Sequence, residues 1–176
     1  MLFRRGAARA LVALLVAGGL AGCTADQPRQ EQPSFYRSLA ASGASVDSQT
    51  AASMISGYRQ NNGLPPVAID PELTRLAEVQ AQAMATQDKV DQRAAGAISI
   101  RLRRSGYNAA VAGENISAGY HTLAEAFSGW RDSPPHRANM LLKGATKMGI
   151  AAIYAPNSKY KVFWSLILAA PDERRG

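Results

Sequence analysis

Two side chains in the middle of the chain, Glu114 and His136, could exchange protons near neutral pH. Glu114 lies in the run Gly113-Glu114-Asn115-Ile116, and His136 lies in residues 133–141, which read SPPHRANML. If they meet in a cleft, a carboxylate and an imidazole can act as an acid/base pair, as in a hydrolase. The alternative is structural: His136 would bond Glu114 or a backbone carbonyl, and backbone amides would hold Glu114.

A helix is predicted between these two runs. Thr122 is followed three residues later by Glu125, which is the pattern of a capping box. Its apolar face is formed by Leu123, Ala126, Phe127 and Trp130. The helix must end before Pro134, because proline disfavours helical geometry in the preceding residue. With Ser133 as its N-cap and Pro134 at its first position, a second helix would place His136 in its first turn.

The two runs, in this order around a helix that contains Trp130, resemble the bacterial branch of the CAP superfamily. This superfamily is named for cysteine-rich secretory proteins, antigen 5 and pathogenesis-related-1 proteins. The resemblance covers roughly residues 46–170 and includes the opening run Gly63-Leu64-Pro65 with Asp70. It implies an α/β fold, a three-layer α/β/α sandwich with a small, mainly antiparallel sheet between helices.

The resemblance also implies a cleft with two histidines and two acidic residues, which in some CAP domains holds a metal ion. Glu114 matches one acid and His136 matches the second histidine, whereas Gln92 stands where the first histidine is expected. Asp132 or Ser133 stands where the second acid is expected. Because a catalytic zinc usually has about three protein ligands, we expect no cofactor and only weak zinc affinity. We further expect Glu114 to raise the pKa of His136.

Three more helices are predicted from caps and hydrophobic periodicity. The first begins near Asp47 and ends at Asn61-Asn62-Gly63, and Asp70 caps the second. The buried positions of the second helix are Leu73, Leu76, Ala77, Ala81 and Met84. A short third helix covers residues 98–105, after a polar loop. Its basic side chains, predicted to form a solvated face, are Arg101, Arg103 and Arg104.

Two strands are predicted after the central stretch, at residues 148–154 and 160–169, with a turn between them. The second strand is apolar at both odd and even positions. A strand that is apolar on both faces is covered on both faces. Helices on either side of this hairpin give the same three-layer sandwich that the family resemblance implies.

The first 22 residues read as an export signal. Three arginines precede a short apolar core that is shorter than the roughly 20 residues of a membrane span. The core ends in Leu20-Ala21-Gly22-Cys23, which matches a bacterial lipobox and predicts that Cys23 carries lipid. The alternative is an ordinary signal peptide with an incidental cysteine. Residues 24–46, rich in Gln, Ser, Ala and Pro, read as a flexible tether, and residues 171–176 as a charged tail.

Composition places few limits on function. The chain has 176 residues and a formal net charge of +7, but without the three leader arginines 17 basic residues stand against 13 acidic ones. No aromatic residues are interleaved with the arginine cluster, so we expect no nucleic-acid partner. The family resemblance and the leader together imply a CAP domain (residues 47–170) that is exported and anchored by lipid on Cys23 to the periplasmic or cell-surface side of a bacterial membrane. We expect it to bind a small or lipid-like ligand or a protein partner through Glu114, His136, Gln92 and Asp132; a hydrolase is the alternative.

Overall fold

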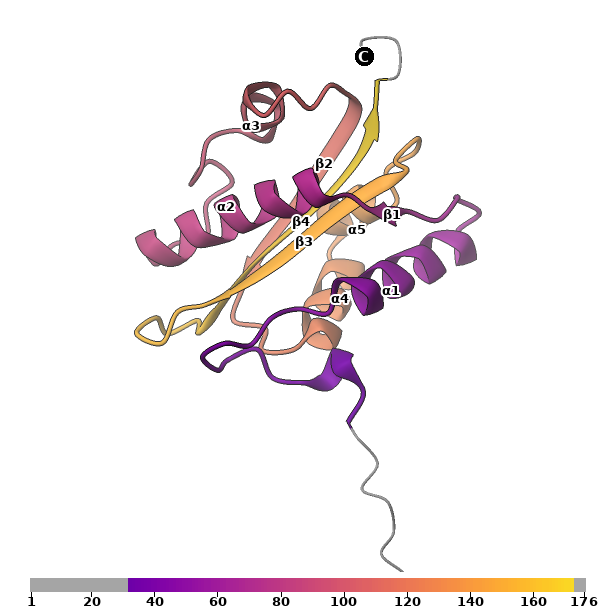
Figure 1. Cartoon of the computed structure of the whole chain (residues 1–176). Helices are drawn as coiled ribbons and strands as arrows, with labels where there is room; N and C mark the ends of the chain where they lie inside the picture. The colour runs from indigo at the N-terminus through magenta and orange to yellow at the C-terminus, as the bar shows by residue number, and fades with distance from the viewer. Residues whose placement is uncertain (1–31, 173–176) are drawn as a thin grey trace, which may run out of the picture. The chain divides into compact units, whose positions relative to one another are not determined.

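A four-stranded sheet in the order β1-β3-β4-β2 lies at the centre of the fold (Figure 1). The computed structural model describes residues 32–172, so the predictions for the export signal, Cys23 and residues 24–31 lie outside it, as do residues 173–176. β1 (Ala68–Ile69) pairs in parallel with β3 (Lys147–Tyr154). β4 (Val162–Pro171) runs antiparallel to both β3 and β2 (Ala109–Ala118). The predicted, mainly antiparallel sheet is confirmed.

Helices cover both faces of this sheet. One face carries α2 (Pro71–Gln87) and α3 (Ile98–Arg104). The other carries α1 (Ser48–Asn61), α4 (Leu123–Asp132) and α5 (Pro134–Met140), preceded in the chain by a single 3₁₀ turn at Ser34–Tyr36. In Figure 1, α2 lies in front of the strands and α4 and α5 lie behind them. The predicted three-layer sandwich is confirmed.

The central strand, β4, is buried on both faces, as its sequence predicts. Phe163 and Ile167 face α2, whereas Trp164 and Leu166 pack with residues of α1, α4 and α5. Trp164 meets Trp130 of α4 edge to face, with ring centroids 6.1 Å apart. Both indole rings are therefore part of the core.

One close approach fixes the position of α2 on the sheet. Gly149 of β3 lies directly beneath the first turn of α2, where a Cβ atom would overlap the backbone of Leu73 and Thr74. Only glycine allows this approach. The contact brings α2 down onto β3 next to the edge of the sheet.

The helix starts follow the predicted caps, with one difference. Asp70 accepts hydrogen bonds from the amides of Glu72 and Leu73, and the capping box of Thr122 and Glu125 is formed. Ser133 occupies the N-cap position of α5, but its side chain makes no capping hydrogen bond.

Asp47 caps α1. Its Oδ1 accepts from the Thr50 amide at 3.0 Å and its Oδ2 from the Thr50 hydroxyl at 2.6 Å. These bonds, chiefly that from the hydroxyl, lower the pKa of Asp47 to about 2.

The substitution Asp47→Ala is expected to lower the free energy of unfolding by about 1 kcal/mol at pH 7. A lowered folded-state pKa stabilises the fold above the unfolded-state pKa, and this stabilisation is lost as the pH falls from about 4 to about 2. The difference between wild type and variant should therefore shrink over that interval, as measured by urea denaturation. Ser45→Ala, an exposed change three residues from the start of α1, is the control. A difference that is the same at both ends of the interval would contradict the assignment.

The strand β2 was not predicted. Its run Ala109–Ala118 contains Gly113, Glu114 and Asn115, residue types that are depleted in strands. Nine of its residues nevertheless pair with β4, from Ala109 opposite Pro171 to Ala118 opposite Phe163. Long-range pairing with a buried strand thus decides its conformation, which local propensity could not reveal.

The compact unit begins earlier than the sequence indicates, at Gln32 rather than near Asp47. Leu39 is buried in the core, and its amide donates to the His121 carbonyl at 2.7 Å. Phe35 packs against the same core. Residues 32–46, which were predicted to be tether, are therefore part of the domain.

Candidate functional site

Glu114 and Asn115 are neighbours on β2 and point to opposite faces of the sheet, since successive side chains of a strand alternate. Glu114 faces α2 and α3, where it bonds Arg101 and Ser165. Asn115 faces α5, where it bonds the backbone carbonyl of His136. The Gly-Glu-Asn run thus serves two sides of the molecule.

Glu114 forms a buried ion pair with Arg101. The distance from Arg101 Nη2 to Glu114 Oε2 is 2.5 Å, and both side chains are at most 5% exposed. The Ser165 hydroxyl donates to Glu114 Oε1 at 2.8 Å. Arg101 also donates to the carbonyls of Leu76 and Gly96 at 2.9 and 3.0 Å. The pair therefore joins α2, α3, β2 and β4.

The prediction that Arg101 lies on a solvated face is wrong, whereas Arg103 and Arg104 are exposed as predicted. Burial raises the pKa of Glu114, and the Arg101 guanidinium and the Ser165 hydroxyl oppose this rise. With both oxygens engaged by other side chains, the carboxylate is held as a structural group.

His136 lies on the other side of the sheet, in the first turn of α5. Its carbonyl accepts from Asn115 Nδ2 at 2.9 Å. Asn139 Nδ2 donates to the Glu114 carbonyl at 3.0 Å and to Asn115 Oδ1 at 2.9 Å. These two asparagines therefore fasten the backbone of α5 onto β2.

The predicted contact between the Glu114 and His136 side chains is wrong, because the sheet lies between them. The predicted rise in the pKa of His136 is wrong too: partial burial lowers this pKa. The alternation of side chains along β2 is the physical reason. Once residues 109–118 form a strand, Glu114 and Asn115 cannot both face α5.

Gln92 and Asp132 do not complete a cluster. Gln92 is exposed in the turn after α2, a loop that is held by Gln80 through bonds to Asp91 and Ala95. Asp132 is exposed at the end of α4 and pairs with Arg131 at 2.8 Å.

The four candidate residues do not fit a metal ion. Two of them belong to the α2 side of the sheet and two to the α4–α5 side. Glu114 already faces a guanidinium, which would repel a cation. Among residues 32–172, no three His, Cys, Asp or Glu side chains are close enough to hold a metal ion together.

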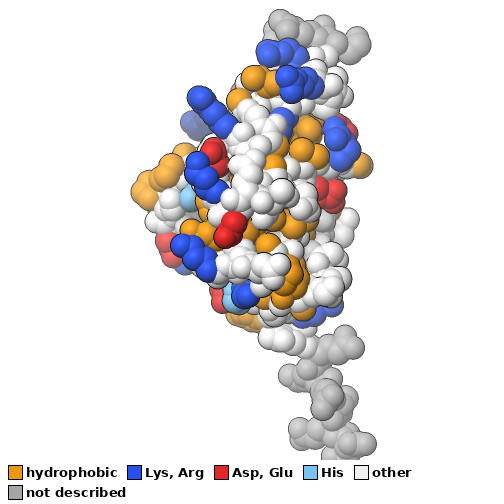
Figure 2. Space-filling view, turned by 90° about the vertical axis from the view of Figure 1, so that its left-hand side faces the viewer, with side chains coloured by type: hydrophobic (Ala, Val, Ile, Leu, Met, Phe, Trp, Pro, Cys, Tyr) orange, Lys and Arg blue, Asp and Glu red, His pale blue; other side chains and the backbone are white. Residues whose placement is uncertain are grey.

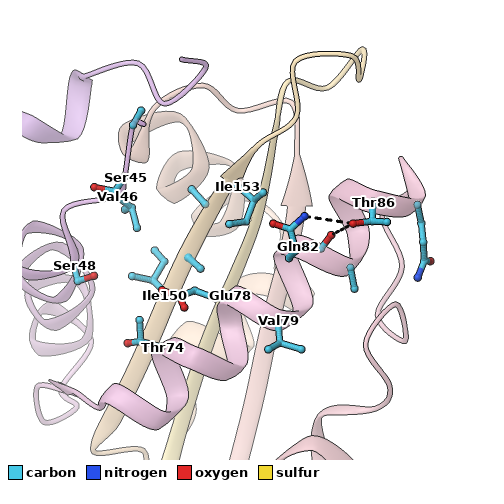
Figure 3. Close-up of a pocket in the computed structure, with 15 residues that line it drawn as sticks. Ser45, Val46, Ser48, Thr74, Glu78, Val79, Gln82, Thr86, Ile150 and Ile153 are labelled. Carbon is cyan, nitrogen blue, oxygen red and sulfur yellow. Dashed lines mark hydrogen bonds between the residues drawn. The ribbon is translucent and has the colours of Figure 1, made fainter. Parts of the chain in front are cut away.

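A large cavity lies elsewhere in the described residues, and sequence reasoning missed it. It has a volume of about 820 Å³ and lies between α2, β3 and residues 44–48, which lead into α1 (Figure 3). We call it the edge groove. Its lining includes Val46, Val79, Ala83, Ile150 and Ile153 together with Thr74, Glu78, Gln82 and Thr86. One signal was available in the sequence: Val79 is an apolar residue of α2 that lies outside the predicted buried stripe. The structure leaves its side chain 43% exposed.

Charge is dispersed on the face that Figure 2 displays. Lys and Arg side chains are spread over it, with Asp, Glu and hydrophobic side chains between them. This face therefore presents no continuous basic surface. Within residues 32–172, no helix has the length and hydropathy that crossing a membrane requires.

Two solved structures that match this fold are described as an extracellular and an outer surface protein of bacteria. An extracellular protein containing an SCP domain from Bacillus anthracis matches with a TM-score of 0.60 and 24% identity, covering 69% of this chain and 39% of that chain. An outer surface protein from Borrelia burgdorferi matches with a TM-score of 0.63 and 16% identity, covering 74% of this chain and 99% of that chain. At these identities the likeness shows the fold alone.

Sequence comparison gives the family. The uncharacterized protein YkwD of Bacillus subtilis is 28% identical over 116 residues, which are 65% of this chain and 45% of that protein. The chain thus spans less than half the length of this curated relative. A model of the cysteine-rich secretory protein family, CAP, matches residues 52–168. The three-layer fold and this match agree, and the chain belongs to the cysteine-rich secretory protein (CAP) family.

Proposed function

We propose that this protein is a lipid-anchored, extracytoplasmic CAP domain that binds a ligand or partner and performs no chemistry on it. The single observation that carries the proposal is the state of Glu114: its two oxygens are bonded to Arg101 and Ser165, on the face of the sheet opposite His136. An acid/base pair must act within hydrogen-bond reach of one substrate. This arrangement favours the binding module over the hydrolase.

The edge groove is the proposed binding site, in place of the cleft expected around Glu114 and His136. Its volume falls within the range of about 300–1,000 Å³ for ligand pockets. Its apolar walls and few polar side chains also suit a small, lipid-like or extended ligand. Neither a cofactor nor a nucleic-acid partner is part of the proposal.

The lipid on Cys23 would keep this groove near the membrane. Residues 24–31 separate Cys23 from the described domain, and eight residues span at most about 28 Å. The structural relatives that are described as extracellular or outer-surface proteins support an extracytoplasmic location.

The anchor is tested by Cys23→Ser. We expect the variant to leave the membrane fraction and to lose the mass of the acyl chains on its N-terminal peptide, since acyl chains are the proposed source of membrane affinity. The control is Ser38→Ala, an exposed change in the domain that leaves the anchor intact. Retention of Cys23→Ser in the membrane at the wild-type level would contradict the proposal.

The hydrolase alternative is tested with a generic ester such as p-nitrophenyl acetate. We expect wild type and His136→Ala to give the same background rate. Turnover above background that His136→Ala abolishes would overturn the binding-module assignment.

A further inference from the structure

β3 is an edge strand along most of its length. β1 pairs only with its first two residues, Lys147 and Met148. The chain then leaves the sheet, because Asp70 caps α2 and Pro71 begins it. From Gly149 to Tyr154, β3 is paired on one side alone, with β4.

Two hydrogen bonds show which backbone groups face outward. The Met148 carbonyl accepts from the Asp70 amide at 2.8 Å, so it points away from β4. The Ala155 amide donates to the Lys161 carbonyl at 2.7 Å, so it points toward the β4 side. Backbone direction alternates along a strand.

The amides and carbonyls of Ile150, Ala152 and Tyr154 therefore point away from β4. Within residues 32–172, no backbone hydrogen bond joins these outward-pointing amides and carbonyls to another strand or to a loop.

The edge groove runs along this unpaired edge. Ile150 and Ala152 point to one face of the sheet and Ala151 and Ile153 to the other, yet all four line the same cavity. Only a cavity that straddles the edge of a strand can meet residues of both faces. In Figure 3, Ser45, Val46 and Ser48 lie to the left of β3, and Gln82 and Thr86 of α2 lie to its right. Thr74 and Glu78 of α2 point into the space between.

We propose that the edge groove takes an extended, non-acidic peptide segment of another protein, which pairs with β3 as a fifth strand. This inference rests on the proposed function of the groove as the binding site. Strand addition satisfies the outward groups of Ile150, Ala152 and Tyr154 through the peptide backbone. Alternate peptide side chains then face Glu78 on α2 and Val46 before α1.

The edge lacks the usual protection against strand addition. Natural edge strands carry charged residues, proline or bulges that block pairing. The stretch Ile150–Ile153 reads IAAI and pairs with β4 in regular register. An extended chain can therefore approach this stretch.

Charge selects the partner. Glu78 is the one ionisable side chain among the residues that line the groove. It is exposed on α2, and the salt bridges within residues 32–172 do not include it. A carboxylate here repels acidic peptides and attracts lysine or arginine at the ends of a peptide strand.

The probe is a fluorescent peptide with the sequence acetyl-Lys-Thr-Val-Thr-Val-Thr-Lys-amide, titrated against the full chain in lipid nanodiscs and followed by anisotropy. Its control carries N-methyl groups on alternate backbone nitrogens, which keep the side chains and remove the pairing donors. We expect saturable binding of the probe and an affinity at least about tenfold lower for the control. Equal affinities would overturn strand pairing.

Two variants locate the site. Ala152→Pro removes an outward N–H from an edge strand, where proline is tolerated; Glu78→Lys reverses the charge of the groove. We expect each to weaken probe binding by about tenfold. Asp132→Lys, on the opposite side of the sheet, makes the same change in net charge and should have no effect. If Ala152→Pro and Glu78→Lys both bound the probe with wild-type affinity, the edge groove would not be its binding site.

Hydrogen exchange gives an independent readout. Without peptide, the amides of Ile150, Ala152 and Tyr154 should exchange faster than those of Ala151 and Ile153, and the peptide should slow them. Slow exchange that depends on protein concentration, without peptide, would overturn the proposal in favour of a second copy of this chain. Binding of palmitate but of neither peptide would overturn strand pairing and leave the proposed binding function standing. Ester turnover that His136→Ala abolishes would contradict the proposed binding function itself.

Discussion

Replacing Arg101 by Met is expected to lower the free energy of unfolding by about 3–5 kcal/mol, because it leaves Glu114 as a buried carboxylate without its cation. The guanidinium now opposes the rise in the Glu114 pKa that burial causes. The double variant Arg101→Met/Glu114→Gln should lose less stability than the two single variants together, since they share one interaction. Urea denaturation of the four proteins measures this coupling. Arg104→Met is the control, because Arg104 is exposed on the same helix.

The same cycle has a pH dependence with a definite sign. Without Arg101, the folded-state pKa of Glu114 rises further above its unfolded value. A raised folded-state pKa favours folding below the unfolded-state pKa, and that contribution is lost as the pH rises through the folded-state pKa. Arg101→Met should therefore be closer to wild type near pH 4 than near pH 8. Additive single variants, or a deficit that does not change with pH, would show that the ion pair does not hold these elements together.

Local sequence signals predicted the helices and the two-faced strand well. Caps at Asp47, Asp70 and Thr122 act within one turn, so the residues that decide them are neighbours in the chain. The continuous apolar run of β4, which is apolar on both faces, is equally local, and the sandwich follows from it.

What the sequence could not reveal depends on partners far away in the chain. Arg101 and Arg104 belong to the same basic run, and only the position of Glu114 across the fold buries the first and leaves the second exposed. The family motif placed Glu114 beside His136, and it was the pairing of β2 with β4 that sent Glu114 to the other face. The edge groove exists because β1 ends at Ile69 and leaves the rest of β3 unpaired on that side. Its walls come from three separate segments of the chain, so no single run of residues could predict it.

Arg59 is the second cation whose removal should be severe. It is fully buried in α1 and donates four hydrogen bonds of 2.9–3.0 Å to backbone carbonyls. The acceptors are Pro65, Met140, Leu142 and Ala145. None of them is a carboxylate, and burial accordingly lowers the pKa of the guanidinium. Its role is to bind the turn between α5 and β3 to α1.

Arg59→Met is expected to lower the free energy of unfolding by at least about 4 kcal/mol, since each stranded buried carbonyl costs about 1–3 kcal/mol. Against a total stability of about 5–15 kcal/mol, the variant should be only marginally folded. Thermal and urea denaturation measure the loss, and Gln60→Met, at the exposed neighbouring position on α1, is the control.

The variant Arg59→Lys separates geometry from charge. Lysine keeps the positive charge but places its three donors on a single atom, which cannot reach all four carbonyls. We therefore expect Arg59→Lys to recover only part of the stability, with faster amide exchange in residues 141–146. Full recovery would mean that charge alone matters there. Partial recovery would show that the planar guanidinium holds the chain that enters β3. Arg59 would then also support the strand whose free edge lines the groove.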